Sequence, residues 1–150
     1  MTIRTKLAVC SSRMITDTQD NRISLIDVFE EIASPSFPVI VPRMTFLWML
    51  EKDAADVNNQ FLGHISLEIG GQVITSFDVD VNFQNVNRTR AVAVLGGLPI
   101  AATGIMRVRF SGEGLPEALY EIEVKSIVGG NAIAAQTPIT NPTPPVTMLS

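Results

Sequence analysis

His64 is the only histidine of the chain, so histidine-based nucleophile or metal chemistry would have to be built around it. A Ser-His-Asp triad needs an oriented imidazole, and a zinc site needs further ligands beside it. His64 alternates with Ile65 and Leu67, which predicts that it points outward from a strand. The serines that could serve such a triad lack the context of a nucleophile elbow: Ser11, Ser12, Ser66, Ser76 and Ser111. We therefore predict no catalytic residue and interpret His64 as an exposed strand residue.

Two acidic turns are the next candidates, because calcium sites of β-sandwiches collect carboxylates from loop ends. Asp17 and Asp20 share one turn, and Asp53 and Asp56 share another. Neither turn has the dense alternation of acidic ligands that a calcium loop needs, and Asp is also an ordinary turn residue. These four residues are weak calcium candidates, and the sequence predicts no cofactor.

Composition excludes several classes of function. Lys and Arg number 11 against 15 Asp and Glu, a formal net charge of −4, and no basic block is present to replace phosphate counterions, so nucleic acid is not an expected partner. No run approaches the roughly 20 apolar residues of a spanning helix, so no membrane span is expected. The single cysteine, Cys10, allows no intramolecular disulfide. We expect a cytoplasmic protein, or a virion-associated one if it is phage-encoded.

A low charge content favours contact with other proteins. Charged residues make up 17% of the chain, against about 25% in average domains, and the mean hydropathy is +0.28. A surface poor in charge has less to keep molecules apart, and large apolar patches usually mark contacts. This indicates self-association.

Period-two apolar patterns separated by Gly, Pro, Asn and Asp dominate the chain, which is typical of an all-β protein. We predict a two-sheet antiparallel β-sandwich of about eight strands, either jelly-roll or immunoglobulin-like. The expected strands are Lys6–Arg13, Arg22–Ile32, Arg43–Lys52, Gln60–Ile69, Val73–Phe83, Thr89–Leu98, Thr103–Ser111 and Leu119–Val128.

Between the second and third strands lies a crossover, 33–42, that contains three prolines. Proline lacks an N–H donor, so this segment is expected to run along an edge and to exclude a central strand, with Phe37 pinning it to the core. The strand that follows carries Trp48 and is apolar on both sides. It is therefore either a central strand or one covered by another element, such as a second subunit or the C-terminal tail.

The last segment is a compositionally distinct, proline-rich tail without charge. We divide the chain into a sandwich domain, 1–128, and this tail, 129–150. The tail is expected to dock on an apolar surface of its own chain or of a neighbour, since its larger apolar residues are unlike those of a disordered linker. These interface candidates are Ile133, Ile139, Val146, Met148 and Leu149.

Two hairpins allow register predictions. Around Gly70-Gly71, a three-residue turn would pair Ile69 with Val73 and Ile65 with Phe77, keeping both apolar sets on the core side. In the last hairpin, partners whose numbers sum to 230 would align four opposite-charge residues on an exposed face. Those pairs are Arg107 with Glu123 and Arg109 with Glu121, and the loop would be 111–118.

One stretch, Asp20–Glu51, resembles a family of short bacterial β-sandwich proteins of unassigned function. The resemblance is carried by the polar turn and strand Asn21–Ile32, by Phe37-Pro38, and by Pro42-Arg43-Met44. It implies a sandwich fold but no activity and no site residues.

The sequence thus favours a non-enzymatic structural or protein-interaction module that associates with itself or belongs to a larger bacterial or phage assembly. A small-ligand or calcium-binding module is the alternative.

Overall fold

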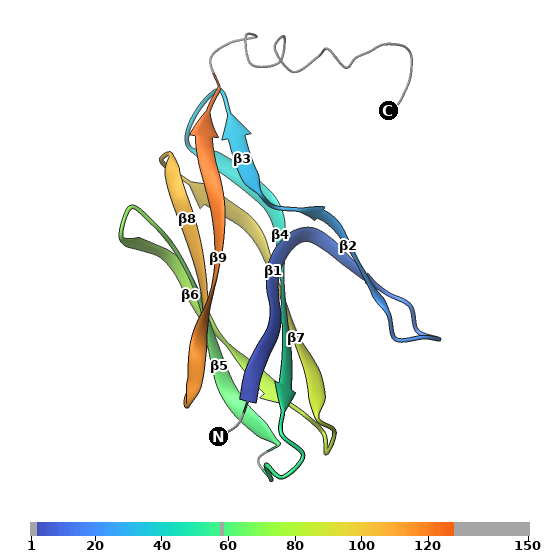
Figure 1. Ribbon diagram of the computed structural model, residues 1–150. Helices are drawn as coiled ribbons and strands as arrows, with labels where there is room; N and C mark the ends of the chain where they lie inside the picture. The colour runs from blue at the N-terminus through green and yellow to red at the C-terminus, as the bar shows by residue number, and fades with distance from the viewer. Residues whose placement is uncertain (1–2, 58, 128–150) are drawn as a thin grey trace.

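The computed structural model describes residues 3–57 and 59–127, and every regular element in them is a β-strand (Figure 1). There are nine: β1 (Ile3–Thr16), β2 (Ile23–Val28), β3 (Glu31–Ser34), β4 (Val39–Lys52), β5 (Gln60–Ile69), β6 (Gln72–Asn82), β7 (Arg88–Ile100), β8 (Gly104–Gly112) and β9 (Leu115–Ser126). No helix of the described residues is long and apolar enough to cross a membrane.

The strands form two sheets that pack as a sandwich, as predicted. Sheet A has the order β2-β1-β4-β7, and sheet B has the order β3-β9-β8-β5-β6. Neighbouring strands are antiparallel except β3 and β9, which run parallel. The prediction of purely antiparallel sheets is therefore wrong at this one pair, because β3 enters sheet B from a crossover rather than from a hairpin.

The ninth strand arises because the predicted strand Arg22–Ile32 divides into β2 and β3, which belong to different sheets. The break lies at Phe29 and Glu30, just beyond Asp27, whose φ of 56° distorts the end of β2. Phe29 then donates its N–H to the carbonyl of Cys10, and the hydroxyl of Tyr120 in sheet B donates to the carbonyl of Phe29. These bonds satisfy the backbone where the chain passes between the sheets.

The proline-rich crossover is corrected in one respect. The edge strand β3 and the packing of Phe37 against the core agree with prediction. However, β4 is central and already starts at Val39, so it contains Pro42. Proline is tolerated there because β4 pairs with β1 only from Thr45 onward, and this part of the strand has β7 alone as its neighbour.

The core is built around Trp48, which is fully buried. Its indole N–H donates to Thr5 Oγ1 (2.9 Å), and its ring meets the ring of Phe61 at 90° with centroids 6.0 Å apart. Gly63 and Gly112 lie opposite each other on β5 and β8. A Cβ on Gly63 would lie 2.5 Å from Trp48 Cζ3, and one on Gly112 would lie 2.6 Å from Phe61 Cε2. This glycine pair makes the space that both aromatic rings occupy.

The β5–β6 hairpin differs from its prediction. A two-residue turn, Gly70-Gly71, has positive φ at both positions and sets Ile69 opposite Gln72. A β-bulge then shifts the register, so that Ile65 still pairs with Phe77 as predicted. Val73 points away from the core and is 60% exposed, whereas Ile74 packs against the core in its place. Two glycines favour the tight turn, and the bulge restores the apolar face.

The register of the β8–β9 hairpin is also corrected. The residue numbers of paired residues sum to 228 rather than 230, so Arg107 pairs with Glu121 and Arg109 lies opposite Leu119. The strands run on to Gly112 and Leu115, and Gly114, with φ of 73°, completes a tight turn in place of the loop 111–118. Arg109 still finds carboxylates, because Glu68 on the neighbouring strand β5 and Glu117 both bind it.

Candidate interaction surface

His64 lies on the outward side of β5, as predicted, with 48% of its side chain exposed. Its Nδ1 lies 2.7 Å from Asp78 Oδ1 on β6, and Ser111 on β8 is its partner on the other side. The pairing therefore sets Ser111, His64 and Asp78 in one row across three strands. Sequence spacing could not show this row, because it depends on strand order.

This row has the residue types of a catalytic triad but not the geometry of one. The hydroxyl of Ser111 donates to the backbone carbonyl of His64 (3.4 Å), whereas a triad serine is hydrogen-bonded to the imidazole. The side chains of His64 and Asp78 are also 48% and 59% exposed to solvent. The row is best described as a polar ladder between neighbouring strands.

The calcium candidates lie in two separate loops. Asp17 accepts the N–H groups of Gln19 (2.9 Å) and Asp20 (3.4 Å), which closes its own turn. Asp20 pairs with Arg22, and Asp53 pairs with Arg4 at 3.0 Å. The backbone carbonyl of Asp56 accepts from Lys52. Within the described residues no group of three or more His, Cys, Asp or Glu side chains gathers in metal-binding geometry.

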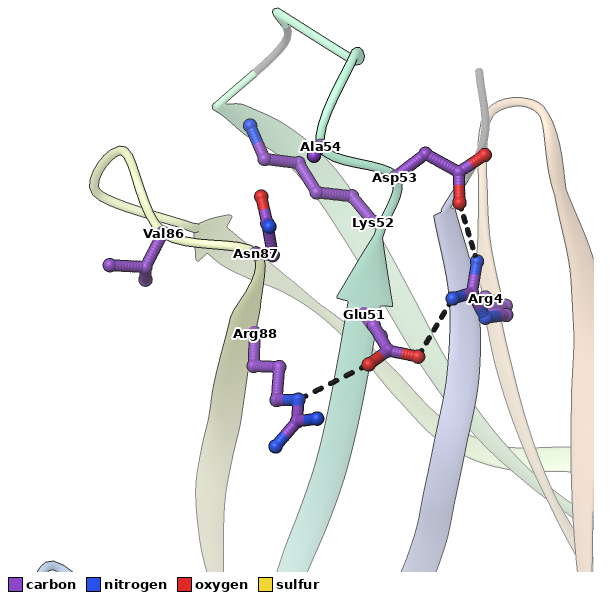
Figure 2. Close-up of a pocket in the computed structure, with 8 residues that line it drawn as sticks. All are labelled: Arg4, Glu51, Lys52, Asp53, Ala54, Val86, Asn87 and Arg88. Atoms are coloured by element: carbon purple, nitrogen blue, oxygen red, sulfur yellow. Dashed lines mark hydrogen bonds and ion pairs between the residues drawn. The ribbon is translucent and has the colours of Figure 1, made fainter.

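The end of sheet A where β1 begins carries an ion-pair cluster that spans three strands and that the sequence did not reveal (Figure 2). Glu51 on β4 binds Arg4 of β1 (2.8 Å) and Arg88 of β7 (3.1 Å), with Lys6 at 3.7 Å. The hydrogen bond from Arg88 lowers the pKa of Glu51 below its usual range, and the charges of Lys6 and Arg4 reinforce the effect against partial desolvation.

The cluster borders an open hollow of about 520 Å³, lined by Arg4, Glu51, Lys52, Asp53, Ala54, Val86, Asn87 and Arg88. Its guanidinium groups could attract an anion, but Glu51 and Asp53 already engage Arg4, and Glu51 engages Arg88 (Figure 2). The cluster therefore acts as a clamp across three strands of sheet A rather than as a ligand site.

The outer face of sheet B, directed away from sheet A, is charged. Arg107 binds Glu121 (3.0 Å) and Lys125 binds Glu31 (2.8 Å), which raises the pKa of Lys125. The exposed apolar side chains of this face each lie opposite a charged residue. The pairs are Leu62 with Asp80, Val73 with Glu68, Ile105 with Glu123, and Leu119 with Arg109. This face has the character of a solvated surface, as predicted for Arg107 and Arg109.

The outer face of sheet A, directed away from sheet B, is apolar over its middle rows. The register sets Val9, Leu47 and Val92 in one row, and Ser11, Thr45 and Val94 in the next. Leu47 is fully buried although it lies outside the core between the sheets, while Val92 is 42% exposed and Val94 is 55% exposed. Here an exposed apolar residue lies beside another apolar or uncharged residue rather than beside a charge.

The β1–β2 hairpin covers part of this face. Arg90 of β7 donates from Nη2 to the carbonyl of Asn21 and from Nη1 to its Oδ1 (3.3 Å). Arg90 lies in the same row of sheet A as Leu7 of β1. If β1 continued straight beyond Leu7, at about 3.3 Å per residue, the hairpin turn would lie roughly 40 Å from that row and could not reach Arg90. The hairpin must therefore fold back over the outer face, as Figure 1 shows beside β4 and β7.

This fold-back resolves the two alternatives for the Trp48 strand. β4 is both central in its sheet and covered on its outer side by another element of the same chain. Thr45, which is 2% exposed, donates to the carbonyl of Ser12 where β1 leaves β4. The candidate contacts Ile133, Ile139, Val146, Met148 and Leu149 lie outside the described residues, as does the domain boundary at 128.

A family model described as a family of unknown function (DUF6941) matches residues 7–125. The chain belongs to this family. No curated protein matches it significantly. Among solved structures, a β-glucosidase from Listeria innocua in complex with gluconolactone is similar at 11% identity and a TM-score of 0.43. The match covers 81% of this chain and only 17% of the glucosidase, so this DUF6941 chain spans a small part of that protein.

Proposed function

We propose that the protein is a non-enzymatic interaction module that associates with itself, or enters a larger assembly, through the outer face of sheet A. The observation that carries this proposal is the difference between the two outer faces. On sheet B, each exposed apolar side chain lies opposite a charge, but on sheet A the exposed apolar side chains lie opposite apolar or uncharged residues. Exposed apolar surface of this kind usually marks a protein contact.

The parts of this face that the hairpin leaves open are its two flanks. Leu7 on β1 is 42% exposed, and Val92 and Val94 on β7 are 42% and 55% exposed. Complete burial of a valine or leucine side chain contributes about 1.5–3 kcal/mol, so even partial burial of these residues by a partner stabilises a complex.

Light scattering on the full chain over a range of concentrations tests the proposal. We expect a mass above the 16.3 kDa of one chain. If the outer face of sheet A is buried, a lysine at one of its two open flanks, Leu7→Lys or Val92→Lys, should lower that mass, according to which flank the partner contacts. Leu119→Lys is the matched control, because Leu119 is 48% exposed on the outer face of sheet B. A monomer at every concentration would contradict self-association.

A calcium or small-ligand module remains the alternative. Calorimetric titration with calcium, together with a thermal-shift screen of sugars and metabolites, separates it from the first proposal. Heat that disappears when Asp17 and Asp20 are changed to Asn would favour the alternative.

A further inference from the structure

The four sheet edges of the described chain are protected to different extents. β2 and β7 are the edges of sheet A, and β3 and β6 are the edges of sheet B. β3 has only four residues, and β2 belongs to the folded-back hairpin. β6 carries Asp78 and Asp80 on its outer side and is interrupted by the bulge next to Val73. Short edges, charges and bulges are the features that prevent one sheet edge from pairing with another.

The edge strand β7 lacks this protection over its middle part. It has 13 residues and pairs on one side only, with β4. Its two arginines, Arg88 and Arg90, lie near one end, and Gly97 and Pro99 lie near the other. The five residues between Arg90 and Gly96 read Ala-Val-Ala-Val-Leu, without charge or proline. A long apolar edge of this kind exposes unpaired backbone N–H and C=O groups to any strand that can join it.

We propose that β7 pairs antiparallel with β7 of a second copy of this chain, with the twofold axis at Ala93. This inference rests on the proposed function and specifies its contact. A twofold axis perpendicular to the sheet relates the two edges in antiparallel orientation, so that one patch of surface serves both copies. The two copies of sheet A then form one continuous eight-stranded sheet.

The side-chain pattern selects this register. Only partners whose numbers have an even sum keep the core side and the outer side continuous across the dimer. A sum of 186 sets Val92 against Val94 of the second copy, so that four valines form one outer cluster. Arg90 then lies opposite Gly96, which has no side chain to meet it. A sum of 184 would set Arg90 against Val94, and a sum of 188 would leave Val92 against Gly96.

Charge also supports the antiparallel orientation of the second copy. Antiparallel pairing separates the arginines of the two chains, whereas parallel pairing would set them side by side, which is unfavourable. The tail 129–150 is less suited to this edge. Four of its residues are prolines, at positions 138, 142, 144 and 145, and proline cannot donate to a strand ladder.

Two matched substitutions test the edge on the full chain by sedimentation equilibrium. Val94→Lys places a charge at the pairing edge of sheet A. Val73→Lys places one at the β6 edge of sheet B, where the replaced valine is similarly exposed (60% against 55%). We expect a dimer whose Kd rises about a hundredfold with Val94→Lys, because each of the two chains contributes one lysine to the contact and each lysine raises the Kd about tenfold. Val73→Lys should leave the Kd unchanged. The emission of Trp48 reports whether each variant is folded.

Disulfide trapping tests the register. Partners directly opposite each other have Cα atoms about 4.5–5.5 Å apart, within the range of a disulfide, whereas diagonal neighbours lie about 7–8 Å apart. An equal mixture of Val92→Cys chains and Val94→Cys chains should therefore form the mixed disulfide in excess of the twofold preference over either like pair that random pairing alone would give. The native Cys10 is fully buried and does not compete.

The outcomes separate this inference from the proposed function. A monomeric wild-type chain would overturn the β7 pairing and, with it, the self-association in the proposed function, while entry into a larger assembly would stand. A dimer that withstands Val94→Lys but dissociates with Leu7→Lys would overturn edge pairing, while contact through the outer face of sheet A would stand. Dissociation by Val73→Lys, or a mixed disulfide at no more than twice the yield of each like pair, would also overturn the β7 pairing centred on Ala93.

Discussion

Gly63 is the position where one added methyl group has the most sharply defined consequence. A Cβ built there lies 2.5 Å from Cζ3 and 3.2 Å from Cη2 of Trp48, and 3.1 Å from Cγ2 of Val79. Carbon atoms pack at about 3.5–4.0 Å, so the indole would have to move by about 1 Å. Its freedom to do so is small, because Thr5 holds the indole N–H and the rings of Phe61 and Phe110 flank it.

Overpacking of a core by extra methyl groups costs about 1–3 kcal/mol, and we expect Gly63→Ala to cost about 2 kcal/mol of the free energy of unfolding. For a chain of this length, that lowers the Tm by about 4–8 °C. Gly96→Ala is the matched control. Gly96 also lies in a strand, but the nearest atom to its added Cβ is 3.8 Å away. The control should leave the Tm within about 2 °C of wild type.

Scanning calorimetry on four chains completes the test: wild type, Gly63→Ala, Trp48→Phe and the double variant. Phenylalanine lacks the benzo ring that contains Cζ3, so in its presence the cost of Gly63→Ala should fall below about 1 kcal/mol. The reasoning would be refuted if Gly63→Ala alone matched wild type. It would equally fail if the cost were the same in both backgrounds, since the indole would then not be the source.

Three further predictions concern the ion-pair cluster, the thiol and the hairpin. Because folding lowers the pKa of Glu51, its ionised side chain contributes to the free energy of unfolding above the unfolded pKa of about 4.3. This contribution is lost as the pH falls toward the pKa of the folded state. Urea denaturation should therefore find wild type more stable than Glu51→Gln at pH 7, with a gap that narrows below about pH 4.3; a constant gap would contradict this. Burial raises the pKa of the Cys10 thiol, so reaction with a thiol reagent at pH 8 should require unfolding, and rapid native labelling would show otherwise. Arg90→Ala should speed hydrogen exchange and proteolysis at the hairpin turn 17–22, with Arg107→Ala as a control that leaves the turn unchanged.

The local pattern of the sequence was sufficient for most strands and for the side that they bury, except where Arg22–Ile32 divides into β2 and β3 and where the bulge turns Val73 outward. Alternation located β5 at Gln60–Ile69 and placed His64 outward, because a period of two is a property of the strand itself. The apolar residues around Trp48 indicated a strand covered on both sides for the same reason. Turn chemistry was harder to judge, since a tight glycine turn and a bulge together can satisfy a pattern that seemed to require a longer loop.

What only the tertiary structure decided is which strands are neighbours. Arg109 binds Glu68, Glu51 binds both Arg4 and Arg88, and Ser111 lies beside His64, each across strands that are distant in sequence. The fold-back of the β1–β2 hairpin and the free edge of β7 likewise follow from strand order. An alternating pattern states which side of a strand is buried but not which strand lies next to it, because many strand orders bury the same residues. The candidate surface was therefore decided by topology, although its apolar residues were already visible in the sequence.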